Sequence, residues 1–233
     1  MKIALAQIRT IKGKVDQNIQ NHLRFIEQAV AQKADLVLFP ELSITGYEPE
    51  LAAVLACTSN DPQFDVFQEI SNQKNIIIGV GMPILKNKAI CISLLIFSPH
   101  QNRQVYTKKY LHADEVPFFK AGQNASNFIK NTSISLAICY EIFVKDHAKK
   151  AGEDGATIYL ASVAKSEKGV KKAYDRLSKV AKNKKMLVLM CNNIGYCDNF
   201  EAKGLSAAWN KEGRLIGQLK GDKEGLLVID TVN

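Results

Sequence analysis

Short apolar runs alternate with longer amphipathic stretches along the first part of the chain. Ile3–Ile8 and Asp35–Phe39 are largely apolar and of strand length, as expected of strands that are covered on both faces. Between them, Asp16–Gln32 repeats apolar residues every three or four positions, which predicts a helix with one buried face. A strand, a helix and a second strand in this order indicate a βαβ unit.

Later segments repeat these two patterns. Asp61 and Pro62 suit the N-cap and first turn of a helix that runs to about Gln73. No internal repeat, low-complexity tract or linker interrupts the sequence, so the elements predict one continuous α/β domain, with a mixed sheet or two sheets packed between helices. The other predicted strands are Asn75–Val80, Ala89–Phe97, Arg103–Thr107, Ile134–Ile138, Ala156–Ala161, Met186–Cys191, Gly204–Trp209, Arg214–Leu219 and Gly225–Ile229, and the other predicted helices are Leu51–Cys57, Asp146–Glu153 and Gly169–Lys185.

Composition and charge narrow the class of protein. The 233 residues carry 31 basic and 23 acidic side chains, a moderate excess that allows an anionic substrate but does not indicate nucleic-acid binding. Five cysteines without a Cys-x-x-Cys pair favour a reducing, cytoplasmic compartment over a disulfide framework or a zinc motif. The N-terminal apolar run is too short for a signal peptide, and no stretch approaches the ~20 residues of a membrane span. We therefore expect a soluble protein that uses no metal or organic cofactor.

Three reactive side chains lie at the ends of predicted strands. They are Glu41, Lys108 and Cys139. Together they suit the hydrolysis of a C–N bond, in which the glutamate acts as general base, the lysine and the N–H of Tyr140 stabilise an oxyanion, and the cysteine forms an acyl-enzyme. Taken alone, Cys139 is more typical of a small core residue, and its combination with the other two favours a nucleophile.

Neighbouring residues leave some alternatives open. Lys109 stands beside Lys108 and is the second candidate for the cationic role. The histidines are not placed to act as bases, and we predict that they are surface or packing residues. They are His22, His100, His112 and His147.

Each of the three reactive residues lies in a short motif. Glu41 lies in Phe-Pro-Glu-Leu, Lys108 in Tyr-Thr-Lys-Lys-Tyr-Leu and Cys139 in Cys-Tyr-Glu. In this order, each after a strand, the motifs resemble those of the nitrilase superfamily of carbon–nitrogen hydrolases, and their alignment selects Lys108 over Lys109. The resemblance extends over nearly the whole chain. It implies one domain over residues 1–233, a four-layer α-β-β-α sandwich and a homodimer.

The resemblance also implies further site residues. In the family a second glutamate follows the lysine by seven or eight positions, and Glu115 fits that place, with Asp114 beside it as an alternative. Glu141 has two interpretations, a site residue or a side chain that braces the loop by hydrogen bonds to the backbone. Tyr140 and Tyr47 are the other residues that we expect near the substrate.

The expected function is the hydrolysis of a small amide or of a ureido (N-carbamoyl) compound. Two alternatives use the same fold: a binding or regulatory protein that has lost turnover, and an acyltransferase in which an amine clears the thioester. The segment after the cysteine keeps the first alternative open, because Lys145 stands where the family has a proline. Lys145, Lys165 and Lys168 suggest a substrate carboxylate, whereas the lysine-rich run Lys165–Lys185 is typical of the solvated face of an amphipathic helix.

Overall fold

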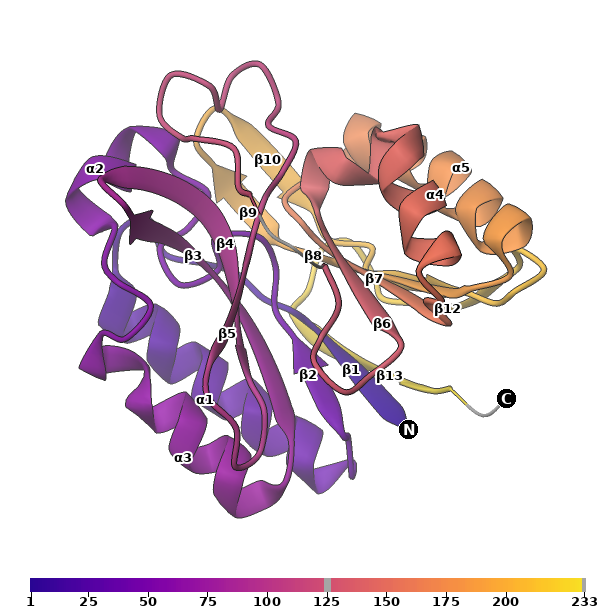
Figure 1. Cartoon of the computed structure of the whole chain (residues 1–233), viewed down its shortest axis with the longest axis horizontal. Coiled ribbons are helices and arrows are strands. Elements are labelled where there is room, and N and C mark those ends of the chain that lie inside the picture. The colour runs from indigo at the N-terminus through magenta and orange to yellow at the C-terminus, as the bar shows by residue number, and fades with distance from the viewer. Residues whose placement is uncertain (124–126, 232–233) are drawn as a thin grey trace.

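Two large β-sheets pack face to face within residues 1–123 and 127–231, the parts of the chain that the computed structural model describes (Figure 1). The first sheet has the strand order β13-β1-β2-β3-β4-β5. Strands β1, β2 and β3 run parallel, and the other neighbours are antiparallel. The strands are β1 (Lys2–Gln7), β2 (Leu36–Leu38), β3 (Ile77–Lys86), β4 (Ala89–Phe97), β5 (Gln104–Thr107) and β13 (Gly225–Asp230).

The second sheet has the order β12-β11-β8-β7-β6. Strands β6, β7 and β8 run parallel, and β11 and β12 extend the sheet in antiparallel fashion. A hairpin of β9 (Ile194–Cys197) and β10 (Phe200–Lys203) follows β8. The strands of the second sheet are β6 (Ile134–Ile138), β7 (Ile158–Val163), β8 (Leu187–Asn192), β11 (Ala207–Trp209) and β12 (Leu215–Gln218).

Helices cover the outer face of each sheet (Figure 1). α1 (Val15–Ala31) and α3 (Asp65–Lys74) pack on the first sheet, and α4 (Lys145–Glu153) and α5 (Glu167–Lys184) pack on the second. Asp61 caps the short 3₁₀ turn η2 (Pro62–Phe64) that leads into α3, and Ser166 caps α5. Short helical turns occur at η1 (Pro49–Leu51), α2 (Ala52–Leu55) and η3 (Cys139–Phe143). In the described ranges, no helix has the length and apolar character to cross a membrane.

The alternation of side chains along the strands explains the layers. On β1, Ile3 and Leu5 belong to the core between the two sheets, whereas Ala4 and Ala6 face the helices of the first sheet. Strand β6 divides in the same way, since its leucine and isoleucines enter the inter-sheet core and Ala137 packs under the helices of the second sheet. Both of these strands are buried on both faces, which is why their sequences are largely apolar.

The predicted α/β class and four-layer arrangement are confirmed, and of the two layouts left open the one with two sheets is correct. The closing strands divide between the sheets, because β13 returns to pair with β1 while β11 and β12 extend the second sheet. Strand β3 is longer than the predicted Asn75–Val80, and Pro83 is accommodated beyond the part that pairs with β2. The β9–β10 hairpin was not predicted, because its strands are short and Tyr196 is 81% exposed.

Candidate active site

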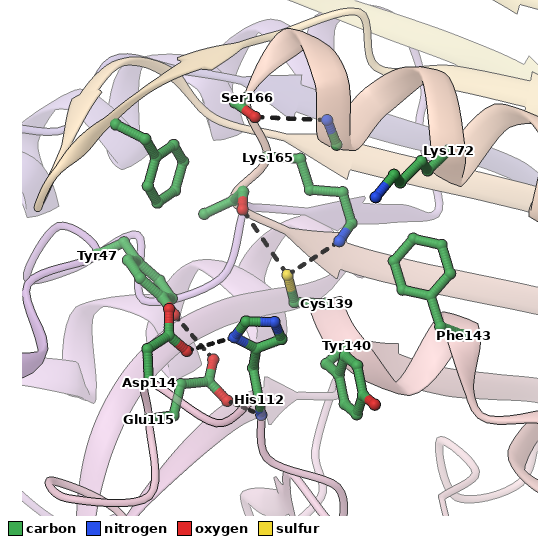
Figure 2. Close-up of a pocket in the computed structure, with 13 residues that line it drawn as sticks. Tyr47, His112, Asp114, Glu115, Cys139, Tyr140, Phe143, Lys165, Ser166 and Lys172 are labelled. Atoms are coloured by element: carbon green, nitrogen blue, oxygen red, sulfur yellow. Dashed lines mark hydrogen bonds and ion pairs between the residues drawn. The ribbon is translucent and has the colours of Figure 1, made fainter.

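The ends of several strands meet around one pocket of about 460 Å³ (Figure 2). Glu41 follows β2, Lys108 follows β5 and Cys139 follows β6. The two sheets are joined at this edge, where the Ser162 hydroxyl near the end of β7 donates a 2.9 Å hydrogen bond to the carbonyl of Phe39. The face-to-face packing of the sheets therefore brings residues from distant parts of the chain to one place.

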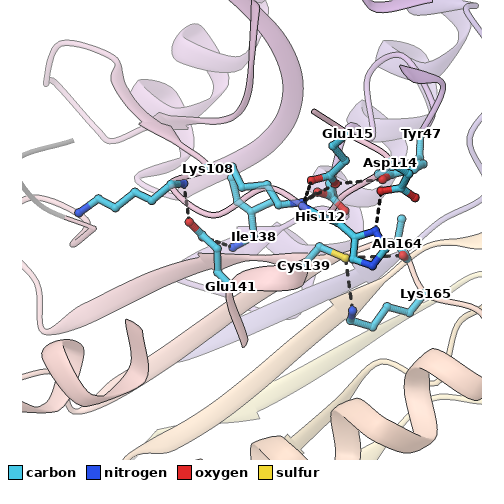
Figure 3. Close-up of polar contacts among 12 residues, drawn as sticks. Tyr47, Lys108, His112, Asp114, Glu115, Ile138, Cys139, Glu141, Ala164 and Lys165 are labelled. Atoms are coloured by element: carbon cyan, nitrogen blue, oxygen red, sulfur yellow. Dashed lines mark hydrogen bonds and ion pairs between the residues drawn. The ribbon is translucent and has the colours of Figure 1, made fainter. Parts of the chain in front are cut away.

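Lys108 links two buried carboxylates, of which Figure 3 labels Glu115. Its Nζ lies 2.7 Å from Glu41 Oε1 and 2.5 Å from Glu115 Oε1, and all three side chains are almost completely shielded from solvent. Glu115 is further fixed by the hydroxyl of Tyr47 at 2.9 Å and by the backbone N–H of His112 at 2.8 Å. An ammonium has three N–H donors, so Lys108 keeps one donor for another oxygen.

Close packing against β3 holds the loop that carries Glu41. The N–H of Ile44 donates to the carbonyl of Gly81 at 3.0 Å, and the N–H of Gly81 donates to the hydroxyl of Ser43 at 3.2 Å. His22 lies 2.9 Å from the same hydroxyl through Nε2, and burial lowers its pKa to about 4, so the ring is neutral near pH 7. His22 is thus a packing residue, as predicted.

Replacing Gly81 by alanine is expected to displace the Glu41 loop. A Cβ at this position would lie 2.6 Å from the carbonyl oxygen of Pro40 and 3.0 Å from the backbone carbon of Glu41, so the backbone must move. A misplacement of about 1 Å can lower a rate about 100-fold, and we expect Gly81→Ala to reduce turnover by about that factor. Gly79→Ala is the matched control, since its Cβ would come closest to the ends of the Leu38 and Ile96 side chains, and the nearest backbone atom, the Val37 oxygen, would be at an ordinary 3.9 Å. Equal activity in the two variants would contradict the prediction.

Cys139 lies at the mouth of the site, where β6 turns into η3. Its φ of 41° is in the left-handed region, which is strained for a residue with a side chain and is common at functional sites. Lys165, which follows β7, places Nζ 3.3 Å from Cys139 Sγ. Tyr140 also lines the pocket, with its ring in edge contact with the His112 ring, and its N–H lies in the first turn of η3, where such groups lack intrahelical acceptors.

The charges of the site determine which group can act as base. Burial raises the pKa of Glu41 to about 6, against the lowering influence of Lys108. Burial and then the charge of Glu41 raise the pKa of Cys139 to about 11. Burial alone would lower the pKa of Lys108, but the charges around it outweigh this effect and raise it. At neutral pH the site therefore holds a thiol, an ionised Glu41 and a firmly charged lysine.

Glu41 has an oxygen available for the thiol proton. Its Oε2 is buried and lacks a hydrogen-bond partner among the described residues. An interaction with the Cys139 side chain lowers the pKa of the Glu41 carboxyl, so the two groups are close neighbours. The arrangement places a general base beside a sulfur nucleophile.

Glu141 fits the second of its two interpretations, the loop brace. Its carboxylate accepts hydrogen bonds from the backbone N–H groups of Ile138 at 2.7 Å and Lys109 at 2.6 Å. It also accepts one from the Tyr106 hydroxyl at 2.7 Å. These bonds fix the ends of β5 and β6 relative to each other. Lys109 contributes its backbone here, whereas the side chain of Lys108 enters the carboxylate cluster.

The predicted substrate-binding lysines are only partly in place. Lys165 lines the pocket, but Lys145 and Lys168 are exposed and outside it. The lining includes a second cation that the sequence did not single out, Lys172 on α5, and the ring of Phe200 on β10. In the sequence nothing distinguishes Lys172 from the other lysines of the run Lys165–Lys185. No cluster of metal-binding side chains was found in the described residues.

A sequence profile of the family described as carbon-nitrogen hydrolase matches residues 2–232. The chain belongs to this family. Its fold matches that of an amidase from Nesterenkonia sp. AN1, a member of the nitrilase superfamily, with a TM-score of 0.87. That amidase is 23% identical, and the match covers 99% of this chain and 92% of the amidase. The predicted carbon–nitrogen hydrolase family is therefore confirmed.

Two proteins of related sequence differ in how much of their length this chain covers. A glutamine-dependent NAD(+) synthetase of Aquifex aeolicus is 23% identical over 239 residues, which cover 98% of this chain and 42% of the synthetase. A protein of Staphylococcus aureus described as a hydrolase in the agr operon is 23% identical over 239 residues, which cover 99% of this chain and 90% of that protein. The chain thus spans less than half the length of the synthetase.

Proposed function

We propose that the protein hydrolyses a small amide or ureido compound through a thioester on Cys139. The observation that carries the proposal is the cluster in which Lys108 contacts both Glu41 and Glu115 beside the thiol. Such a cluster supplies a nucleophile, a base and a cation within one water-poor site.

The first half of the reaction forms the thioester. Glu41 takes the proton from the thiol, and Sγ bonds to the carbonyl carbon of the substrate. The resulting oxyanion accepts hydrogen bonds from the third N–H of Lys108 and from the backbone N–H of Tyr140. As the oxyanion collapses, the C–N bond breaks, and the leaving nitrogen takes the proton from Glu41.

The second half releases the acid. A water molecule attacks the thioester carbon and transfers a proton to Glu41, the C–S bond breaks, and the thiol recovers that proton. Glu115 keeps Lys108 in place throughout, since it accepts a bond from the lysine while Tyr47 and the N–H of His112 fix it. Asp114 lines the pocket but is exposed, and its carboxylate lies 2.6 Å from Nδ1 of His112. Glu115 is thus the better candidate for the second glutamate.

The test is ammonia release from a panel of small amides, ureido acids and nitriles, followed by intact-protein mass. Glutamine belongs in the panel because relatives of this chain are glutamine-dependent enzymes. We expect ammonia release and a transient adduct whose mass equals the acyl part of the substrate. An acyl adduct that is cleared only by added amines would instead support an acyltransferase. The absence of adduct and ammonia across the panel would favour a binding protein.

A further inference from the structure

Lys165 contacts the reacting sulfur but belongs to neither the carboxylate cluster nor the surface of α5. Its Nζ is 3.3 Å from Cys139 Sγ and 4.8 Å from the centre of the Phe143 ring, and the residue is 8% exposed (Figure 2). Among the described residues, no carboxylate forms an ion pair with this ammonium. A buried lysine normally has an anionic partner, and the group it contacts here is a thiol.

The backbone of Lys165 is rigidly held. Its N–H donates to Asn192 Oδ1 at 2.8 Å, and its carbonyl accepts hydrogen bonds from Asn192 Nδ2 at 3.1 Å and from the N–H of Lys203 at 3.0 Å. Asn192 ends β8, so the position of Lys165 is set by the sheet rather than by a free loop. The contact between ammonium and aromatic ring adds a favourable cation–π interaction. The ammonium is therefore preorganised at the sulfur.

The charge balance of the cluster requires a second cation. Two carboxylates, Glu41 and Glu115, share the single ammonium of Lys108, which leaves one net negative charge before the thiol reacts. When the thiol proton moves to Glu41, that negative charge moves to Sγ. Lys108 is held between the two carboxylates, and a thiolate in a partly buried site is more stable with a cation in direct contact.

We propose that Lys165 is a fourth catalytic residue, whose ammonium stabilises the Cys139 thiolate that forms when Glu41 accepts the thiol proton. This role rests on the proposed function in one respect, namely that Cys139 is the nucleophile. The charge of Lys165 lowers the pKa of Cys139 more than that of Lys108 does, although burial and Glu41 raise it overall. Other titratable groups of the site lie on the loops after β2 and β5, on η3 and on α5, namely Glu41, Tyr47, Lys108, His112, Asp114, Glu115, Tyr140 and Lys172.

The test measures thiolate formation directly and needs no substrate. Cys139 is alkylated with iodoacetamide at a series of pH values, and the modified peptide is quantified by mass spectrometry in native protein, Lys165→Met and Lys168→Met. In Lys165→Met, we expect the midpoint of the pH dependence to rise by at least about one unit, so that alkylation near neutral pH slows at least tenfold. Lys168→Met removes an exposed lysine outside the pocket and is expected to leave the rate unchanged. An unchanged midpoint in Lys165→Met would overturn the proposal.

A second reagent separates thiolate stabilisation from attraction of an anion. Iodoacetate carries a negative charge, whereas iodoacetamide is neutral. If Lys165 stabilises the thiolate, both reagents slow by a similar factor at equal pH in Lys165→Met. Slowing of iodoacetate alone would overturn the proposal and assign Lys165 to the binding of an anionic substrate.

Two further variants of Lys165 separate the effect of its charge from an effect on folding. Lys165→Arg keeps the positive charge and is expected to retain a midpoint near that of the native protein, whereas Lys165→Gln should behave like Lys165→Met. Thermal unfolding of each variant is measured alongside. A rise of the midpoint in Lys165→Arg as large as in the two neutral variants would indicate a packing role and contradict the catalytic one. The alkylation assay uses iodoacetamide in place of the substrate. Its result therefore does not depend on whether the substrate of the proposed hydrolysis has been identified.

Discussion

Cys139→Ala is expected to abolish ammonia release and the acyl adduct together. Without Sγ no thioester can form, and the remaining groups can only orient water and stabilise charge. Removal of the nucleophile from covalent hydrolases lowers kcat by on the order of 10⁴–10⁶-fold, and we expect a loss in this range. Steady-state ammonia release and intact mass on the best substrate of the panel measure it. Folding should be retained, since Cys139 is partly exposed and alanine is smaller.

Cys57→Ala is the matched control for this substitution. Cys57 is also partly buried and free, but it lies outside the pocket, beside α2 and the end of β3. We expect this variant to keep both turnover and adduct. Ammonia release by Cys139→Ala at more than a hundredth of the native rate would exclude a thioester on Cys139 as the main route.

The apolar runs made most of the architecture predictable. The strands that precede Glu41 and Cys139 are buried on both faces, and the strand that precedes Lys108 is buried at its end, so the ends of all three could be located from the sequence. Because catalytic groups follow such ends directly, Glu41, Lys108 and Cys139 could be proposed together, and the structure brings them to one site. The predicted homodimer is untested and stays a prediction.

Other features depend on contacts between residues that are far apart in the sequence, and they could not be predicted from local patterns. The proximity of Lys165 to Cys139 results from the parallel pairing of β6 with β7 and from the side-chain hydrogen bonds of Asn192. In the sequence, Lys165 looked like the first member of a solvated lysine run. The other lysines of that run are largely exposed on α5, as predicted, but Lys165 precedes the helix and turns inward. Glu141 likewise showed its bracing role only through its partners.

Glu41→Gln is expected to remove activity and, at neutral pH, to stabilise the fold. The amide cannot accept the thiol proton, and loss of a general base typically lowers the rate about 10²–10⁴-fold. In the native protein, kcat/KM should rise with pH through about 6, the pKa to which burial raises Glu41, because only the ionised carboxylate acts as base. This rising limb should be absent from any residual activity of Glu41→Gln.

The effect on stability follows from the same raised pKa. Because the pKa of Glu41 is about 6 in the folded state and 4.5 ordinarily, the folded protein prefers the protonated form. The stabilisation that this proton gives is complete below about pH 4.5 and is lost as the pH rises through about 6. Ionised Glu41 therefore lowers the free energy of unfolding near pH 7 by about 2 kcal/mol, and glutamine, a neutral isostere, avoids that cost.

Urea unfolding at pH 7 and at pH 4.5 tests this argument. We expect Glu41→Gln to exceed native protein in stability at pH 7 and to lose most of that advantage at pH 4.5. Glu69→Gln on the exposed face of α3 serves as control, with little change at either pH. A variant less stable than native protein at pH 7 would mean that the ion pair with Lys108 outweighs the burial of the carboxylate. Greater stability together with lost turnover would instead indicate that the fold maintains an unfavourable buried charge because the reaction requires a base there.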